Sequence, residues 1–246
     1  LDANRSPANG PIVFPPTVRT NEDAWRQPAP LELYVDFETV NDLDDDFAAF
    51  PDRGGQPLIF MVGCGHVDAD DQWQFQVFTA DRLVEDEEKR VLDAWFAHMR
   101  SLCDEAGIDL ADARLYHWSP AERTTLRSAY NSAAERHGLT RWDGLPWVDL
   151  LNDVVRREPV TVRQAFGFGL KAIAKAMHAH DLIETSWTDG PTDGLGAMVG
   201  AWWCHQEAEK RGVSMRKLDL MSEIEDYNEV DCKVMWEVLQ YLRHNR

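Results

Sequence analysis

The sequence predicts an α/β fold in which helices flank a mixed five-stranded sheet. Two observations favour this class: three strand-like segments follow one another early in the chain, and helical and strand-like segments alternate after them. Consecutive strands favour an antiparallel meander, whereas strands separated by helices favour parallel pairing. We therefore expect a three-strand antiparallel meander extended by parallel strands, with helices packed on the faces of the sheet.

Five segments have the pattern of strands. Residues 31–40 contain good strand formers, and alternation along them places Leu33, Val35 and Phe37 on one face. The others are predicted at residues 58–65, 73–78, 114–118 and 147–150. The second segment is apolar throughout, which is typical of a central strand covered on both faces. The third alternates with period two, as a less buried strand does.

Apolar residues at helical spacing predict five helices. They cover about residues 81–105, 119–137, 168–177, 195–211 and 222–244. The first of them is amphipathic and can pack on the sheet, and the third follows a loop that is interrupted by glycine. Residues 189–196 are rich in Gly, Pro and Asp, which favours an exposed loop.

The chain divides into an N-terminal arm and one large domain. Six prolines and the lack of an apolar period predict that residues 1–30 form an extended arm or linker. Residues 31–246 are long enough to build one core, and 44% of the chain is hydrophobic. Because the chain starts with Leu rather than Met, we expect a part of a longer protein or a processed chain.

Charge and residue usage argue against several classes of function. The formal charge of −18 disfavours a protein that coats nucleic acid non-specifically, because phosphate binding normally depends on Lys and Arg. No segment approaches the ~18 apolar residues of a membrane span, and no signal-type segment opens the chain. We therefore expect a cytoplasmic protein without a membrane partner. Four scattered cysteines without a CxxC pair favour reduced structural thiols over a zinc site or disulfides.

Two acidic side chains interrupt the first predicted strand. Asp36 and Glu38 share one face of it with Tyr34, because side chains alternate along an extended chain. Two carboxylates at this spacing repel each other and resist desolvation, so they need a compensating cation. A divalent metal ion is the simplest one.

The last predicted helix carries a third acid on its buried face. Asp231 falls in the middle of an apolar stripe. The stripe consists of Ile224, Tyr227, Val234, Met235, Val238 and Leu242. A buried aspartate is costly unless it is paired, hydrogen-bonded or bound to metal. Tyr227 lies one turn earlier, so its hydroxyl and the Asp231 carboxylate can point into one cavity, although Tyr227 alone also suits an ordinary core position.

These carboxylates predict a site for two Mg²⁺ or Mn²⁺ ions, which prefer carboxylate ligands. Two such ions roughly 3.5–4 Å apart can activate a water and neutralise charge on the attacking and leaving oxygens of a phosphodiester. Tyr227 could then orient that water by hydrogen bonding. The five aspartates within residues 41–52 form either a solvated loop or a rim of this site.

Two short motifs resemble those of a nuclease superfamily. They are Asp36-Phe37-Glu38-Thr39 and, far downstream, Tyr227-Asn228-Glu229-Val230-Asp231. In this order they resemble the first and third motifs of the DEDD 3′–5′ exonucleases, in the tyrosine (DEDDy) branch. More narrowly, residues 31–246 are similar to the ribonuclease H-like exonuclease domains that accompany RecB-like nuclease and helicase modules.

The resemblance implies a ribonuclease H-like fold and hydrolysis at nucleic-acid 3′ ends with two Mg²⁺ or Mn²⁺ ions. The metal ligands that it implies are Asp36, Glu38, Glu122 and Asp231. Tyr227 would position the attacking water, and Thr39 and His117 would contact the substrate.

The middle motif departs from the pattern of the superfamily, which usually ends in Asp after a polar residue four or five positions earlier. This sequence offers His117 and Glu122 at those places. Ser119, Pro120 and Glu122 also match a helix capping box, in which Glu122 only closes onto the backbone of Ser119. If Glu122 is a cap, Asp149 is the substitute for the fourth carboxylate. His117 would equally suit a polar position at a strand end.

The sequence thus predicts a metal-dependent 3′–5′ exonuclease that acts on single-stranded 3′ ends, with DNA favoured over RNA and RNA left open, within or beside a larger nucleic-acid-processing protein. The irregular middle motif leaves open a catalytically inactive nuclease-like module that binds nucleic acid or protein, and the same fold also suits a structure-selective endonuclease. Lys171 and Arg163 flank the glycine-interrupted loop and either touch phosphates or are solvated helix ends.

Overall fold

The centre of the protein is a five-stranded mixed sheet. The computed structural model describes residues 10–40, 57–118, 133–138, 145–187 and 194–246. The strands of the sheet are Glu32–Val40 (β2), Leu58–Val67 (β3), Trp73–Thr79 (β4), Arg114–His117 (β5) and Trp147–Asp149 (β6). Their order is β4-β3-β2-β5-β6, in which β2, β3 and β4 are antiparallel and β5 and β6 run parallel to β2. The predicted α/β class, the meander and its extension by parallel strands are confirmed.

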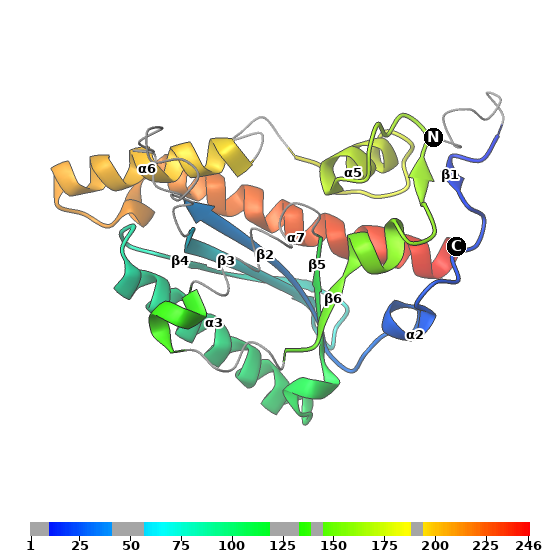
Figure 1. Cartoon of the computed structure of the whole chain (residues 1–246), viewed down its shortest axis with the longest axis horizontal. Helices are drawn as coiled ribbons and strands as arrows, with labels where there is room; N and C mark the ends of the chain where they lie inside the picture. The colour runs from blue at the N-terminus through cyan, green and yellow to red at the C-terminus, as the bar shows by residue number, and fades with distance from the viewer. Residues whose placement is uncertain (1–9, 41–56, 119–132, 139–144, 188–193) are drawn as a thin grey trace.

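Helices cover both faces of this sheet (Figure 1). The helices within the described ranges are Glu22–Trp25 (α2), Glu85–Ala106 (α3), Leu170–His178 (α5), Gly194–Arg211 (α6) and Asp219–Asn245 (α7). Short turns of helix lie at Leu110–Asp112 (η2), Leu150–Val155 (η4) and Met215–Lys217 (η5). α3 contacts β3 and β4, whereas α7 crosses the sheet over β2, β3 and β4. Four of the five predicted helices are therefore present within a few residues of their expected bounds.

The fifth predicted helix, at residues 119–137, lies mostly outside the described residues. Residues 133–137 are helical, and the preceding part is not described. The acidic segment 41–52 and most of the loop predicted at 189–196 also lie outside the described residues, whereas residues 194–196 already belong to α6.

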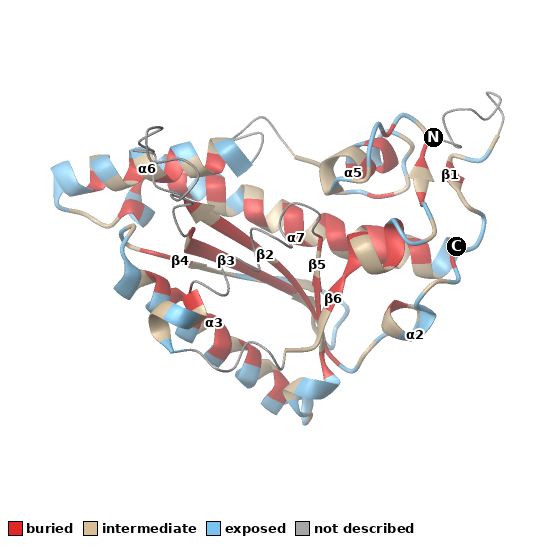
Figure 2. Cartoon of the chain, in the orientation of Figure 1, coloured by how far each residue is buried: buried red, intermediate tan, exposed pale blue. Residues whose placement is uncertain are grey.

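Alternation along β2 directs its apolar side chains toward α3. Leu33, Val35 and Phe37 are buried, and the ring of Phe37 meets the ring of Trp95 on α3 edge-on, with 5.3 Å between centroids. β2 and β3 are buried along most of their length, whereas β4 is mostly half-buried or exposed, and α3 and α7 are buried along the sides that face the sheet (Figure 2). The opposite face of β2, which carries Asp36, is the one that α7 covers.

Polar contacts at both ends hold α7 in place on the sheet. Near its C-terminal end, Arg243 donates to both carboxylate oxygens of Glu32 at the start of β2, at 2.6 and 2.7 Å. In its N-terminal half, Glu225 accepts a hydrogen bond from the hydroxyl of Thr79 on β4 at 2.6 Å. Bidentate Arg–carboxylate pairs restrict geometry as well as adding energy. Asp231, which lies between these two contacts, is therefore placed over β2.

The N-terminal arm packs against the domain. Val13–Phe14 (β1) pairs with Thr161–Val162 (β7), and Trp25 of α2 is fully buried. The backbone N–H of Val18 donates to the carbonyl of Arg246 at 2.9 Å. The described part of the predicted arm thus adds buried side chains to a hydrophobic cluster that it shares with α5 and the C-terminal half of α7. The domain boundary at residue 31 stays a prediction.

The structure bears on the predictions about the cysteines and about membrane spans. All four cysteines are buried free thiols, as the sequence predicts. Within the described ranges, no helix combines the length and the apolar character that crossing a membrane requires. The cytoplasmic location stays a prediction.

Candidate metal centre

Three of the predicted carboxylates meet between β2 and α7. Ligand oxygens of Asp36, Glu38 and Asp231 all lie within 4.8 Å of one another. Glu38 is 7% exposed and Asp231 is 8% exposed, whereas Asp36 is half-buried. Oxygens that coordinate one divalent cation at about 2.0–2.6 Å must lie within about 5 Å of each other. The cluster therefore has the spacing that a shared cation requires.

The strand next to the one that carries two of these acids contains a bulge at the cluster. Asp36 pairs with Gly63 and Glu38 pairs with Met61, but Thr39 pairs with Ile59, so β3 contains one extra residue at this point. Such bulges bend a strand and are common beside functional sites. Thr39, which was predicted to contact substrate, directly follows the cluster and is half-buried.

Asp231 lies in a buried and polar environment. The indole Nε1 of Trp187 donates to its Oδ1 at 2.9 Å, and the hydroxyl of Tyr227 also forms a hydrogen bond with it. Burial raises the pKa of the Asp231 carboxyl from its ordinary value of 3.8 to about 7, although the nearby Lys171 ammonium and these two hydrogen bonds act in the opposite direction. A bound cation would lower this pKa again, because a nearby positive charge favours the ionised carboxylate.

Tyr227 lies beside all three carboxylates. Burial raises the pKa of its hydroxyl far above the ordinary value of 10.0, and the negative charges of Asp231, Glu38 and Asp36 raise it further. The hydroxyl is therefore neutral at physiological pH and serves as a hydrogen-bond donor. The ammonium of Lys171, in the first turn of α5, lies 4.3 Å from the centroid of the Tyr227 ring.

Two further residues contact the carboxylates of this centre, and the sequence did not predict a role for either. Asn228 is fully buried and donates from Nδ2 to Oδ2 of Asp36 at 2.8 Å. Its position three residues before Asp231 is a helical-spacing signal that could have revealed it. Trp187 comes from an irregular segment after α5, where no periodicity indicates which residue faces α7.

Asp149, the alternative fourth carboxylate, has a local role in the structure. Its Oδ1 accepts from the backbone N–H of Asn152 at 3.0 Å and its Oδ2 accepts from Asn152 Nδ2 at 2.8 Å, so it caps the helical turn η4. It does not belong to the carboxylate cluster found among the described residues. Glu122, the first choice for the fourth ligand, lies outside the described residues, and both of its predicted roles stay predictions.

The other predicted contact residues lie in different surroundings. His117 ends β5, pairs in register with Asp149, and meets the ring of Trp147 edge-on with 5.4 Å between centroids. Arg163 donates to the carbonyl of Gly10 at 2.8 Å, which ties the arm to the loop before α5. Of the two cations that flank this loop, Lys171 is thus the one beside the cluster.

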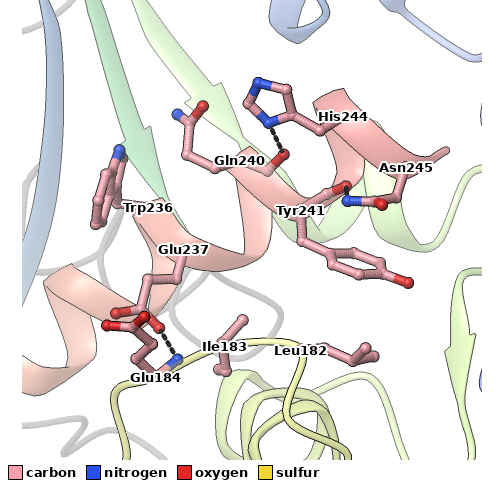
Figure 3. Close-up of a pocket in the computed structure, with 9 residues that line it drawn as sticks. All are labelled: Leu182, Ile183, Glu184, Trp236, Glu237, Gln240, Tyr241, His244 and Asn245. Carbon is pink, nitrogen blue, oxygen red and sulfur yellow. Dashed lines mark hydrogen bonds between the residues drawn. The ribbon is translucent and has the colours of Figure 1, made fainter.

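A separate pocket of about 330 Å³ lies along the C-terminal half of α7 (Figure 3). Its lining includes Ile183, Trp236, Tyr241 and Glu237, and Glu237 accepts a hydrogen bond from the backbone N–H of Glu184 at 2.9 Å. None of the three clustered carboxylates lines this pocket. The pocket is therefore not the site of the carboxylate chemistry.

Comparisons with protein-family models, with curated proteins and with solved structures give no match to this chain. A fold alone does not determine a function, so function has to be argued from the chemistry of the site.

Proposed function

We propose that the chain is a metal-dependent 3′–5′ exonuclease of the DEDDy type, built on a ribonuclease H-like fold. One observation carries this proposal: acids from the two ends of the domain converge within 4.8 Å at a largely buried place. Three carboxylates held together in this way repel one another unless a cation compensates them. The motif order and the sheet arrangement expected for that fold are consistent with this assignment.

The donor set fits Mg²⁺ or Mn²⁺. The cluster among the described residues consists of carboxylates alone, whereas zinc sites in proteins usually include His or Cys. Asp36, Glu38 and Asp231 would hold the ions, with Glu122 as the proposed fourth ligand. Bound ions would lower the pKa of an attacking water and neutralise charge on both the attacking and the leaving oxygens of a phosphodiester.

The protein's own groups orient the reacting atoms. Hydrogen bonds from Trp187 and Tyr227 fix the carboxylate of Asp231. The Tyr227 hydroxyl, which uses its proton for Asp231, can accept a hydrogen bond from a water and so fix the direction of its attack. The ammonium of Lys171, close enough to act on Asp231, supplies positive charge for a substrate phosphate.

The acidic character of the chain narrows the proposed substrate. With a formal charge of −18, the protein has little non-specific attraction for long duplex, so a short single-stranded 3′ end is the best-suited substrate. DNA is proposed before RNA. A partner or a further module of a larger nucleic-acid-processing protein would then supply most of the affinity for nucleic acid.

The direct test is hydrolysis of short labelled substrates. Single- and double-stranded DNA and RNA, 5′-labelled and with either a free or a blocked 3′ end, are incubated with Mg²⁺, with Mn²⁺ and with chelator. The proposal expects stepwise shortening of the free 3′ end that is lost on blocking and in chelator. Cleavage of a circular single strand would instead indicate an endonuclease. No cleavage together with no Mn²⁺ binding at millimolar concentration would favour an inactive binding module.

Tyr227→Phe tests the proposed orientation of water. We expect kcat to fall on the order of 10–100-fold, because one hydrogen bond to a charged or reacting group contributes about 1.5–3 kcal/mol. Mn²⁺ affinity should change little, since the carboxylates remain. Single-turnover rates at saturating metal give the measurement, and an unchanged rate would remove the assigned role of Tyr227.

Glu122→Gln separates the two predicted roles of Glu122. Gln replaces Glu well in a capping box but cannot supply a negatively charged ligand. We expect hydrolysis to be strongly reduced while the Tm in chelator is unchanged. Full activity would assign Glu122 to the helix cap alone.

A further inference from the structure

Asn228 is the buried neighbour of a ligand carboxylate. Its side chain is fully buried on α7, and its Nδ2 donates to Oδ2 of Asp36 at 2.8 Å. A carboxylate only accepts hydrogen bonds at neutral pH, so this contact fixes which end of the amide is the nitrogen. Asn228 therefore restricts the rotation of the Asp36 carboxyl group about its bond to the chain.

A glycine on the neighbouring strand β3 leaves space for the Asn228 amide. Gly63 pairs with Asp36 across β2 and β3, and a Cβ at residue 63 would lie 1.7 Å from the Oδ1 of Asn228. Real Cβ atoms do not approach other atoms that closely. The missing side chain of Gly63 is therefore what gives the Asn228 amide its space beside Asp36.

The amide oxygen of Asn228 is not stabilised by a hydrogen bond at this position. Oδ1 of Asn228 is buried and has no hydrogen-bond partner within the part of the chain that the structure describes. A buried amide oxygen without a partner destabilises a fold, and such groups in a native protein call for an explanation. The contact of its nitrogen with Asp36 is the explanation that the geometry offers.

We propose that Asn228 is a positioning residue of the metal centre, which acts through Asp36, and that Gly63 is the residue that makes room for it. The inference rests on the proposed metal function of the carboxylate cluster. Groups that donate to a ligand carboxylate orient it, and their loss typically lowers metal affinity about 10–100-fold. Asn228 thereby holds Asp36 in the orientation in which it can share a cation with Glu38 and Asp231.

The first test removes the N–H donor of Asn228 but keeps the size of its side chain. Asn228→Leu has nearly the same size but no N–H, and we expect the Mn²⁺ affinity, measured by electron paramagnetic resonance titration, to fall about 10–100-fold. Gly63→Ala keeps Asn228 but pushes its amide away from Asp36, so we expect a similar fall. The Tm of each variant in chelator shows whether it is folded.

Gly65→Ala is the matched control in the same strand. A Cβ at residue 65 would lie 2.3 Å from the ring of Trp73, so this variant introduces a comparable steric conflict with a residue outside the carboxylate cluster. We expect its Tm to fall while its Mn²⁺ affinity stays that of the unchanged protein. An equal loss of Mn²⁺ affinity in Gly65→Ala and Gly63→Ala would show a general effect of strand distortion and overturn the inference.

A double-mutant cycle shows whether Asn228 acts through Asp36. In an Asp36→Ala background, in which Asn228 has no side-chain acceptor at residue 36, adding Asn228→Leu should change the Mn²⁺ affinity by no more than about two-fold. In an Asn228→Ala background, Gly63→Ala should likewise add no further loss. Additive losses would indicate a purely structural role and overturn the inference.

The titrations separate this inference from the proposed function. If the unchanged protein binds Mn²⁺ and Asn228→Leu binds it equally well, the positioning role is wrong and the metal centre stands. If the unchanged protein binds no Mn²⁺, the metal centre is wrong and the inference falls with it.

Discussion

Replacing Asp36 with Ala is expected to slow metal-dependent release of nucleotides by about 1,000-fold or more, while the protein remains folded. Asp36 is one of three carboxylates that converge on the proposed cation site, and it is the only one of them that is half-buried. Metal-ion catalysis supplies several kcal/mol of transition-state stabilisation, and each 1.36 kcal/mol corresponds to a factor of ten in rate. Loss of a ligand should therefore remove most of the activity.

The loss of activity has to be distinguished from damage to the fold. Asp36→Ala leaves the Nδ2 of Asn228 without its carboxylate acceptor, whereas Asp36→Asn retains an oxygen that can accept. Both variants should lose hydrolysis, and Asp36→Asn should keep the Tm of the unchanged protein in chelator. Gel assays on a 5′-labelled single strand give the rates, and near-normal turnover in both variants would contradict the two-ion assignment.

Asp149→Asn is the control for replacing a buried aspartate on the same sheet. Asp149 caps η4 through Asn152, and Asn is itself a good capping residue. We expect this variant to retain its activity. A loss as large as that of Asp36→Asn would return Asp149 to the position of fourth ligand.

The core of the candidate site was predictable because two simple periodicities determine it. The period of two along β2 puts Asp36 and Glu38 on one face, and the period of 3.6 along α7 puts Asp231 and Tyr227 on the buried side. Each signal is local in the sequence. An acid on an otherwise buried face stands out in either pattern, which is why the cluster could be expected before the two elements were seen together.

Other features depend on contacts between distant segments, which periodicity does not encode. The amide of Asn228 matters only because Gly63 leaves space for it on another strand. Trp187 reaches Asp231 from an irregular segment, and the proline-rich arm is held by pairing with Thr161–Val162. The role of Asp149 as a cap was missed because its strand was expected to continue to residue 150, whereas helical geometry begins there.

Asp231→Asn is expected to stabilise the protein in chelator, and to do so more strongly as the pH rises. The carboxyl of Asp231 has a pKa of about 7 in the folded protein, against 3.8 as its ordinary value, and burial is the main cause. A folded-state pKa that lies above the unfolded one contributes stability that is fully present below pH 3.8 and is lost as the pH rises to about 7. Asn carries no charge to desolvate at any pH.

The size of the effect follows from the pH interval. Between pH 5.5 and pH 8.5 the unchanged protein loses stability over roughly 1.5 pH units, up to the folded pKa, which corresponds to about 2 kcal/mol. For a chain of this length, the difference in Tm between Asp231→Asn and the unchanged protein should therefore grow by about 4–8 °C from pH 5.5 to pH 8.5, which scanning calorimetry resolves. Asp226→Asn is the matched control, because Asp226 is exposed on the same helix. It should show no such pH dependence.

Addition of Mn²⁺ should narrow the difference in stability between Asp231→Asn and the unchanged protein at pH 8.5. A ligand that binds only the folded state stabilises it by about 2.7 kcal/mol at a concentration 100-fold above its Kd, so the unchanged protein gains in Tm. Asp231→Asn lacks a ligand and should gain much less. A variant that is less stable than the unchanged protein in chelator at every pH would show that the Asp231 carboxylate supports the fold through its contacts with Trp187 and Tyr227. A variant that is more stable in chelator and does not respond to Mn²⁺ identifies Asp231 as a metal ligand whose buried charge destabilises the fold when no metal is bound.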